Sequence, residues 1–107
     1  MDRYRILIVE DDEDIVETVK YALELRGFEV DVAYDGLHAL RKARKNEYDL
    51  MLLDIMLPGK NGYEVSHLLK TDMEEGRIDS FGILLFTARK LDNEFRYLTP
   101  ESAGRGR

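Results

Sequence analysis

Acidic residues stand directly after two short apolar segments of this chain. Residues 6–9 lead into the sequence Glu-Asp-Asp at residues 10–12, and residues 50–53 lead into Asp54. Short apolar runs bounded by polar turns are typical of strands that are buried on both faces. Ligands of an open parallel sheet bind beyond the carboxyl ends of its strands, so these carboxylates are expected to meet there. Gathered carboxylates repel one another unless a cation lies between them, and a hard divalent cation prefers oxygen ligands.

Composition and charge are consistent with one globular domain. The chain has 107 residues, of which 44% are hydrophobic and 36% are charged, and its net charge is −6. Residues 1–54 carry 14 acids and 8 bases, whereas residues 55–107 carry 8 of each. The negative excess therefore lies in the half that holds the acidic cluster. This distribution favours cation binding and disfavours direct nucleic-acid binding, which requires a basic face.

Other classes of protein are disfavoured by what the sequence lacks. It has no cysteine, which excludes disulfides, zinc-thiolate sites and a cysteine nucleophile. The first residues are charged and run directly into an apolar segment, so no signal peptide is expected. No apolar run approaches the roughly 20 residues of a membrane span. The sequence therefore predicts a cytoplasmic protein without membrane contact.

The hydrophobic pattern alternates between strands and helices. Strands are predicted at residues 4–10, 28–33, 49–53 and 81–86, and helices at residues 13–26, 37–45 and 63–74. This β-α-β rhythm predicts an α/β fold with a parallel sheet. The domain is expected to span residues 1–100, because residues 101–107 are small and polar and are expected to form a disordered tail.

Three segments, residues 8–12, 54–62 and 84–89, resemble the motifs of a two-component response-regulator receiver domain. Their order and spacing fit that family over about residues 3 to 89. The resemblance implies a doubly wound, flavodoxin-like fold with strand order 2-1-3-4-5. It also implies a phosphoacceptor that a histidine kinase or phosphotransfer protein phosphorylates. Such a domain is not an enzyme, beyond slow self-catalysed phosphorylation and dephosphorylation.

The resemblance assigns a role to each residue of the acidic site. Asp54 would attack phosphorus and form an aspartyl phosphate, while Mg²⁺ neutralises the developing charge. Thr87 would donate a hydrogen bond to the phosphoryl group and act as the switch. The metal ligands would be Asp11, Asp12, Asp54 and the backbone carbonyl of Met56.

Each of these residues also has a simpler interpretation. Asp54 would be an acidic turn residue after a strand, and Thr87 a β-branched residue that suits a strand. Asp11 and Asp12 would cap the following helix, where aspartate is favoured. Glu10 is expected to face outward rather than bind the metal.

The C-terminal part departs from the receiver pattern. Only 12 positions separate Thr87 from Thr99, fewer than the family needs, so helix 4 is expected to be shortened and helix 5 missing. The lysine expected in the fifth strand is absent, and Lys90 or Lys60 would have to replace it. Tyr97 would correspond to the switch aromatic of the family.

These departures keep more than one function open. The first is a phosphoacceptor domain that acts through protein contacts. The alternative is a receiver-like binding, dimerisation or decoy module with little phosphorylation-dependent switching, or a truncated fragment of a longer regulator. A sheet that lacks a covering helix exposes apolar surface, so a homodimer is also expected.

Overall fold

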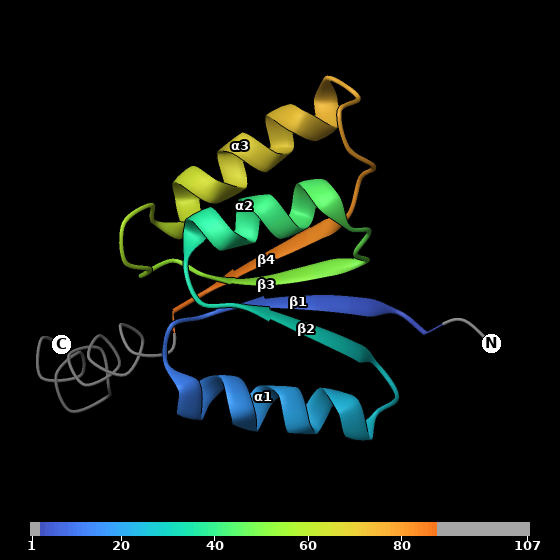
Figure 1. The fold of residues 1–107 in the computed structure, drawn as a ribbon, viewed down its shortest axis with the longest axis vertical. Coiled ribbons are helices and arrows are strands. Elements are labelled where there is room, and N and C mark those ends of the chain that lie inside the picture. The colour runs from blue at the N-terminus through green and yellow to red at the C-terminus, as the bar shows by residue number, and fades with distance from the viewer. Residues whose placement is uncertain (1–2, 88–107) are drawn as a thin grey trace, which may run out of the picture.

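The computed structural model describes residues 3–87, which form an α/β domain (Figure 1). The elements in chain order are β1 (Arg5–Val9), α1 (Glu13–Leu25), β2 (Glu29–Ala33), α2 (Gly36–Lys45), β3 (Leu50–Asp54), α3 (Gly62–Glu74) and β4 (Gly82–Phe86). Each boundary lies within one residue of the boundary predicted from the sequence. The hydrophobic pattern was therefore sufficient to predict the type and extent of these elements.

The four strands form a parallel sheet with the order β2-β1-β3-β4. This confirms the predicted order for the part of the sheet that lies within residues 3–87. Val9 pairs with Ala33 on one side and with Leu53 on the other, and Asp54 pairs with Phe86. Because all strands run the same way, the residues that follow β1, β3 and β4 meet at one edge of the sheet.

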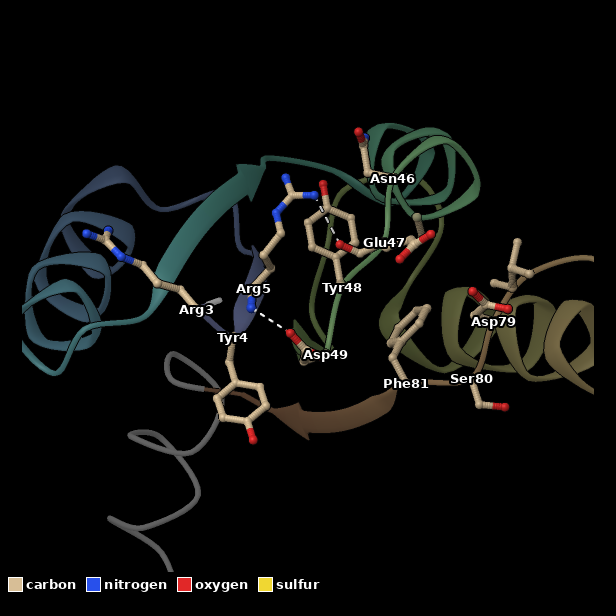
Figure 2. Close-up of a pocket in the computed structure, with 12 residues that line it drawn as sticks. Arg3, Tyr4, Arg5, Asn46, Glu47, Tyr48, Asp49, Asp79, Ser80 and Phe81 are labelled. Carbon is tan, nitrogen blue, oxygen red and sulfur yellow. Dashed lines mark hydrogen bonds between the residues drawn. The ribbon is translucent and has the colours of Figure 1, made fainter. Parts of the chain in front are cut away.

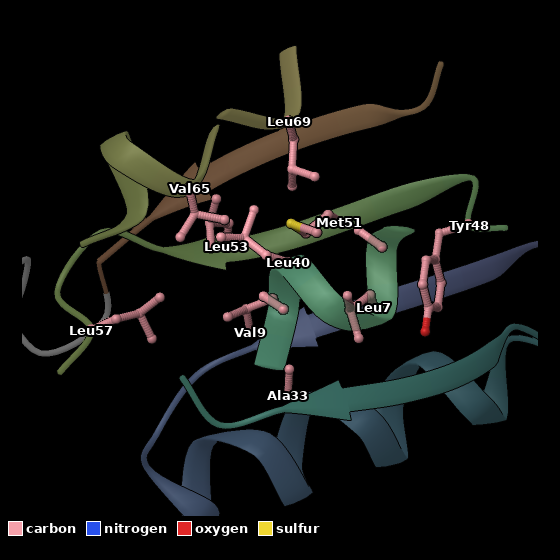
Figure 3. Close-up of a cluster of buried hydrophobic side chains, with 12 residues drawn as sticks. Leu7, Val9, Ala33, Leu40, Tyr48, Met51, Leu53, Leu57, Val65 and Leu69 are labelled. Atoms are coloured by element: carbon pink, nitrogen blue, oxygen red, sulfur yellow. The ribbon is translucent and has the colours of Figure 1, made fainter. Parts of the chain in front are cut away.

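The helices lie on both faces of the sheet, with α1 on one face and α2 and α3 on the other (Figure 1). The main core lies between the sheet and the α2–α3 layer (Figure 3). Leu7, Met51 and Leu53 come from the central strands, Leu69 comes from α3, and all four are fully buried. Full burial of a leucine side chain contributes roughly 1.5–3 kcal/mol. The two central strands are thus anchored where they carry the acidic residues.

Short polar side chains begin each helix. Asp12 Oδ1 accepts hydrogen bonds from the backbone N–H groups that start α1, and Asp35 Oδ1 accepts one from the start of α2. Asn61 and Glu64 form a reciprocal capping box at the start of α3. Gly27 follows α1 with a φ of 91°, a conformation that glycine adopts without steric cost.

Several predictions lie outside the described residues. They are the shortened helix 4, the missing helix 5, the lysine substitute Lys90, the switch aromatic Tyr97 and the tail at residues 101–107. The domain boundary at residue 100 likewise stays a prediction. Among residues 3–87, none of the helices is long and apolar enough to span a bilayer.

Candidate metal site

Three carboxylates gather at the edge of the sheet where β1 and β3 end. Glu10, Asp11 and Asp54 each offer an oxygen atom, and these atoms all lie within 4.8 Å of one another. Glu10 and Asp11 follow β1, and Asp54 is the last residue of the neighbouring strand β3. Glu10 and Asp54 are buried, whereas Asp11 is partly exposed. The cluster is therefore anchored in the fold and open to solvent on one side.

The expectation that Glu10 faces outward is wrong. Its side chain has no exposed surface. The strand-like backbone continues one residue beyond β1, because the Glu10 N–H donates to Ala33 O at 3.1 Å. Glu10 Oε2 then accepts a hydrogen bond from the Asp12 N–H at 2.9 Å. A turn that closes on its own side chain directs this carboxylate inward, and the sequence pattern did not reveal it.

The cluster is electrostatically unfavourable without a cation. The pKa of Glu10 is raised to about 7, mainly by burial and also by the negative charge of Asp54, while the hydrogen bond from the Asp12 N–H lowers it. A carboxyl group with such a pKa indicates that negative charge is poorly compensated at the site. Hard oxygen ligands on a partly open face fit Mg²⁺, which usually retains several water molecules and binds one or two carboxylates.

Asp12 lies beside this cluster without belonging to it. Its Oδ1 caps α1 by accepting from the N–H groups of Asp14 at 2.9 Å and Ile15 at 3.3 Å. The capping interpretation of this residue therefore accounts for one of its two oxygens. Its role as a metal ligand stays a prediction.

The loop that follows β3 orients the Asp54 side chain. The Met56 N–H donates to Asp54 Oδ1 at 3.0 Å, and the Ile55 N–H donates to Phe86 O at 2.7 Å. Met56 is 46% exposed, so its side chain is not part of the buried core. Use of its backbone carbonyl as a metal ligand stays a prediction.

Thr87 lies one residue beyond the strand pair that Asp54 makes with Phe86. Its hydroxyl oxygen is buried and has no hydrogen-bond partner among residues 3–87. A buried hydroxyl without a partner costs free energy, so a ligand oxygen that accepts from it would be favoured. Lys60 is exposed in the loop after β3 and makes no ion pair within the described part of the chain.

A hollow of about 740 Å³ lies at the opposite edge of the sheet, where the strands begin (Figure 2). In its wall the Arg5 guanidinium lies 5.0 Å from the centroid of the Tyr48 ring, and Asp49 Oδ2 accepts from the Arg5 N–H. These contacts join β1 to the segment that leads into β3. The carboxylates that could share a cation do not line this hollow, because they lie at the other edge of the sheet.

The fold and this site define a receiver domain. The family described as the response regulator receiver domain matches residues 6–99. The chain therefore belongs to the receiver family of two-component response regulators. This confirms the family that the sequence motifs indicated.

Curated relatives of this family are longer than this chain. The alkaline phosphatase synthesis regulatory protein PhoP of Bacillus subtilis is 42% identical over 91 residues, which are 85% of this chain and 35% of PhoP. The response regulator ArlR of Staphylococcus saprophyticus is 44% identical over 66 residues, which are 62% of this chain and 30% of ArlR. The chain thus spans about a third of the length of these relatives.

Solved receiver structures have the same fold. TrrA of Thermotoga maritima in complex with Mg²⁺ and BeF is 28% identical, with a TM-score of 0.63, and the match covers 89% of this chain and 98% of TrrA. A complex of TrrA with the histidine kinase ThkA matches with the same TM-score and identity, over 90% of this chain and 98% of that chain. The receiver domain of HemR from Leptospira biflexa is 30% identical, with a TM-score of 0.68, over 91% of this chain and 77% of that chain.

Proposed function

We propose that this receiver domain accepts a phosphoryl group on Asp54 from a histidine kinase or phosphotransfer protein, with Mg²⁺ as cofactor. The observation that carries the proposal is the position of Asp54. It ends the central strand β3, shares a cluster of carboxylates, and pairs with the residue before Thr87. An acceptor carboxylate, acidic neighbours and a hydroxyl therefore converge on one edge of the sheet.

Asp54 is the nucleophile of the proposed reaction. A carboxylate oxygen attacks phosphorus as the P–N bond of phosphohistidine breaks, and the imidazole nitrogen takes back the bonding electron pair. The hydrogen bond from the Met56 N–H to Asp54 Oδ1 restricts rotation of the carboxylate before the attack. Phosphoryl transfer depends mainly on positioning and charge neutralisation, so this restriction contributes directly to the rate.

The acidic neighbours would hold the cation. Asp11 and Asp54 are the proposed carboxylate ligands, and Asp12 and the Met56 carbonyl would contribute as well. Buried Glu10 is the third carboxylate of the cluster. When bound, Mg²⁺ would neutralise negative charge on the phosphoryl oxygens. The Thr87 hydroxyl would donate to one of these oxygens, and movement of Thr87 toward it would be the first step of switching.

Two lysines are candidates for contact with the phosphoryl group. Lys60 lies in the loop that follows Asp54, and Lys90 lies outside the described residues. We propose either as the substitute for the family lysine. Such a site supports slow self-catalysed phosphorylation and dephosphorylation rather than enzyme turnover on a separate substrate.

The partners follow from the same site. TrrA, a structural relative, forms a complex with the histidine kinase ThkA, and a kinase is the proposed partner of this domain. The acidic first half of the chain argues against direct nucleic-acid contact. We also propose a cytoplasmic location.

The exposed face of the sheet suggests a homodimer. Ile83 and Leu85 pack on the core, whereas Leu84 between them points to the other face and is 57% exposed.

A second candidate function is a binding or decoy module that does not switch. The exposed Leu84 favours it, because apolar surface on a strand suits protein contacts. Beryllofluoride with Mg²⁺, a phosphoryl mimic, separates the two functions by NMR. The phosphoacceptor proposal predicts that the amide resonance of Thr87 shifts on its addition. A Thr87 resonance that stays in place while Mg²⁺ binds would support the binding module.

A further inference from the structure

We propose that Gly36, the first residue of α2, is a positioning residue for the metal and phosphoacceptor site. It acts through the loop of residues 55–61, which joins β3 to α3 and carries the groups that orient Asp54. This inference rests on the function proposed above, since it concerns the same carboxylates. Helix α2 supplies none of the proposed ligands, but through Gly36 it would influence how they are positioned.

The space around Gly36 is too small for a Cβ atom. A Cβ atom at this position would lie 2.8 Å from Val65 Cγ2 and 2.9 Å from Lys60 O. Val65 is fully buried in the core and β-branched, and Lys60 O belongs to the backbone, so neither atom can turn aside. Gly36 does not have a positive φ. The position therefore requires glycine for close approach and not for backbone conformation.

The contacts that hold α2 in place determine which segment would move if a side chain were added at position 36. Asp35 caps its first turn by accepting from the His38 N–H at 2.8 Å. Lys42 Nζ ties the helix to β2 through Asp31 Oδ1 at 2.8 Å and Val32 O at 2.7 Å. The buried face of the helix also packs in the core. A side chain at position 36 would consequently displace the loop at Lys60 and the first turn of α3 at Val65, rather than α2.

Displacement of the loop would reach the acceptor carboxylate. The two ends of the loop meet beside Asp54, because the Gly62 N–H donates to Ile55 O at 2.9 Å and a Cβ on Gly62 would lie 2.5 Å from Asp54 O. The loop is thus closed against β3, while Lys60 within it contacts α2. Between Ile55 and Lys60, Met56 donates the hydrogen bond to Asp54 Oδ1. A shift at Lys60 has to be absorbed by the short segment that contains Met56.

The test is the Gly36→Ala variant, with Mg²⁺ affinity measured by calorimetry and folding checked by thermal unfolding in chelator. Supporting groups around a metal site typically change affinity by 10- to 100-fold, and we expect the Kd for Mg²⁺ to rise by about tenfold or more. Gly82→Ala is the matched control. Its Cβ would lie 3.3 Å from the side-chain atom Leu50 Cδ1, at the other end of the sheet, so its Kd is expected to stay at the wild-type value.

The outcomes separate this inference from the function on which it rests. A wild-type protein that binds no Mg²⁺ would remove the proposed metal site itself. A folded Gly36→Ala protein with wild-type affinity would overturn only the positioning role. If the variant does not fold, NMR of the wild type decides. The amides of Gly36 and Met56 are expected to shift with one midpoint as Mg²⁺ is added, and an unmoved Gly36 amide would overturn the inference.

Discussion

Glu10 and Asp54 occupy adjacent positions at the ends of two neighbouring strands. Their preceding residues, Val9 and Leu53, are register partners, and both acidic side chains are buried with oxygens that lie within 4.8 Å. Two buried carboxylates at this separation destabilise the folded state unless protons or a cation compensate their charge. The carboxylate cluster therefore links the stability of the domain to occupation of the proposed metal site.

Removing the buried charge at Glu10 is predicted to have opposite effects on stability and metal binding. Glu10→Gln keeps the side-chain shape and an oxygen that can accept from the Asp12 N–H. In chelator at pH 8 the variant should be more stable than wild type by about 1–3 kcal/mol, since the unfavourable charge is gone. Its Mg²⁺ affinity should fall. Urea unfolding with and without Mg²⁺ measures both effects, and equal stability in chelator would contradict the electrostatic argument.

Asp72 is predicted to stabilise the domain in a pH-dependent manner. Arg44 Nε contacts its Oδ2 at 2.7 Å and Arg77 Nε contacts its Oδ1 at 3.0 Å. The hydrogen bond from Arg44 holds the pKa of Asp72 below its usual value, with Arg77 acting in the same direction. The folded pKa lies below the unfolded pKa, so this stabilisation is complete above the ordinary pKa of 3.8 and is lost as pH falls through the lowered value.

The Asp72→Asn variant tests this pH dependence. At pH 7 the variant should lose about 1.5–3 kcal/mol of unfolding free energy, the range for hydrogen bonds to a charged group. Near pH 3 the difference from wild type should shrink. Urea denaturation at the two pH values gives the comparison, and Mg²⁺ affinity serves as the control because Asp72 lies outside the carboxylate cluster. A loss of the same size at both pH values would show that the charge of Asp72 does not contribute to the stability of the domain.

The hydroxyl of Thr87 is predicted to matter for the phosphorylated state and not for folding. Thr87→Ala removes a buried oxygen that has no partner among residues 3–87, so stability should be unchanged or higher by up to about 1 kcal/mol. Thr87→Ser retains the hydroxyl and is the matched control. Stabilisation by beryllofluoride and Mg²⁺, measured as a rise in Tm, should be smaller for alanine than for serine. Equal rises would exclude a contact between the hydroxyl and the phosphoryl mimic.

Leu84 is predicted to mediate self-association. Its side chain is 57% exposed on the sheet face opposite the α2–α3 layer. Leu84→Asp should shift sedimentation at high concentration toward monomer, while Leu37→Asp, which changes an equally exposed leucine on α2, should leave the distribution unchanged. A wild-type protein that sediments only as a monomer at every concentration would remove the homodimer from the account.

The fold followed from the sequence because its signals are local. Continuous apolar runs marked the central strands, the period of apolar positions marked the helices, and Asp12 stood where a cap is expected. The acidic site followed from topology, since parallel strands end at one edge. These signals required no knowledge of long-range contacts.

The inward position of Glu10 and the close approaches of Gly36 and Gly62 could not be predicted in this way. A buried carboxylate violates the hydropathy pattern, and it is tolerated here because a turn and neighbouring groups hydrogen-bond it. Glycine is needed at these positions because a Cβ atom would collide with Lys60, Val65 or the backbone of Asp54, which lie elsewhere in the chain. Sequence spacing contains no information on such contacts.

The most direct test of the central claim is intact-mass analysis of the protein after incubation with acetyl phosphate. Wild type is expected to gain one phosphoryl group in the presence of Mg²⁺ and none in chelator. Asp54→Asn should gain none, whereas Asp49→Asn, which changes an acidic residue at the opposite edge of the sheet, should behave as wild type. A gain that persists in Asp54→Asn, or the absence of any gain in wild type that binds Mg²⁺, would contradict the account.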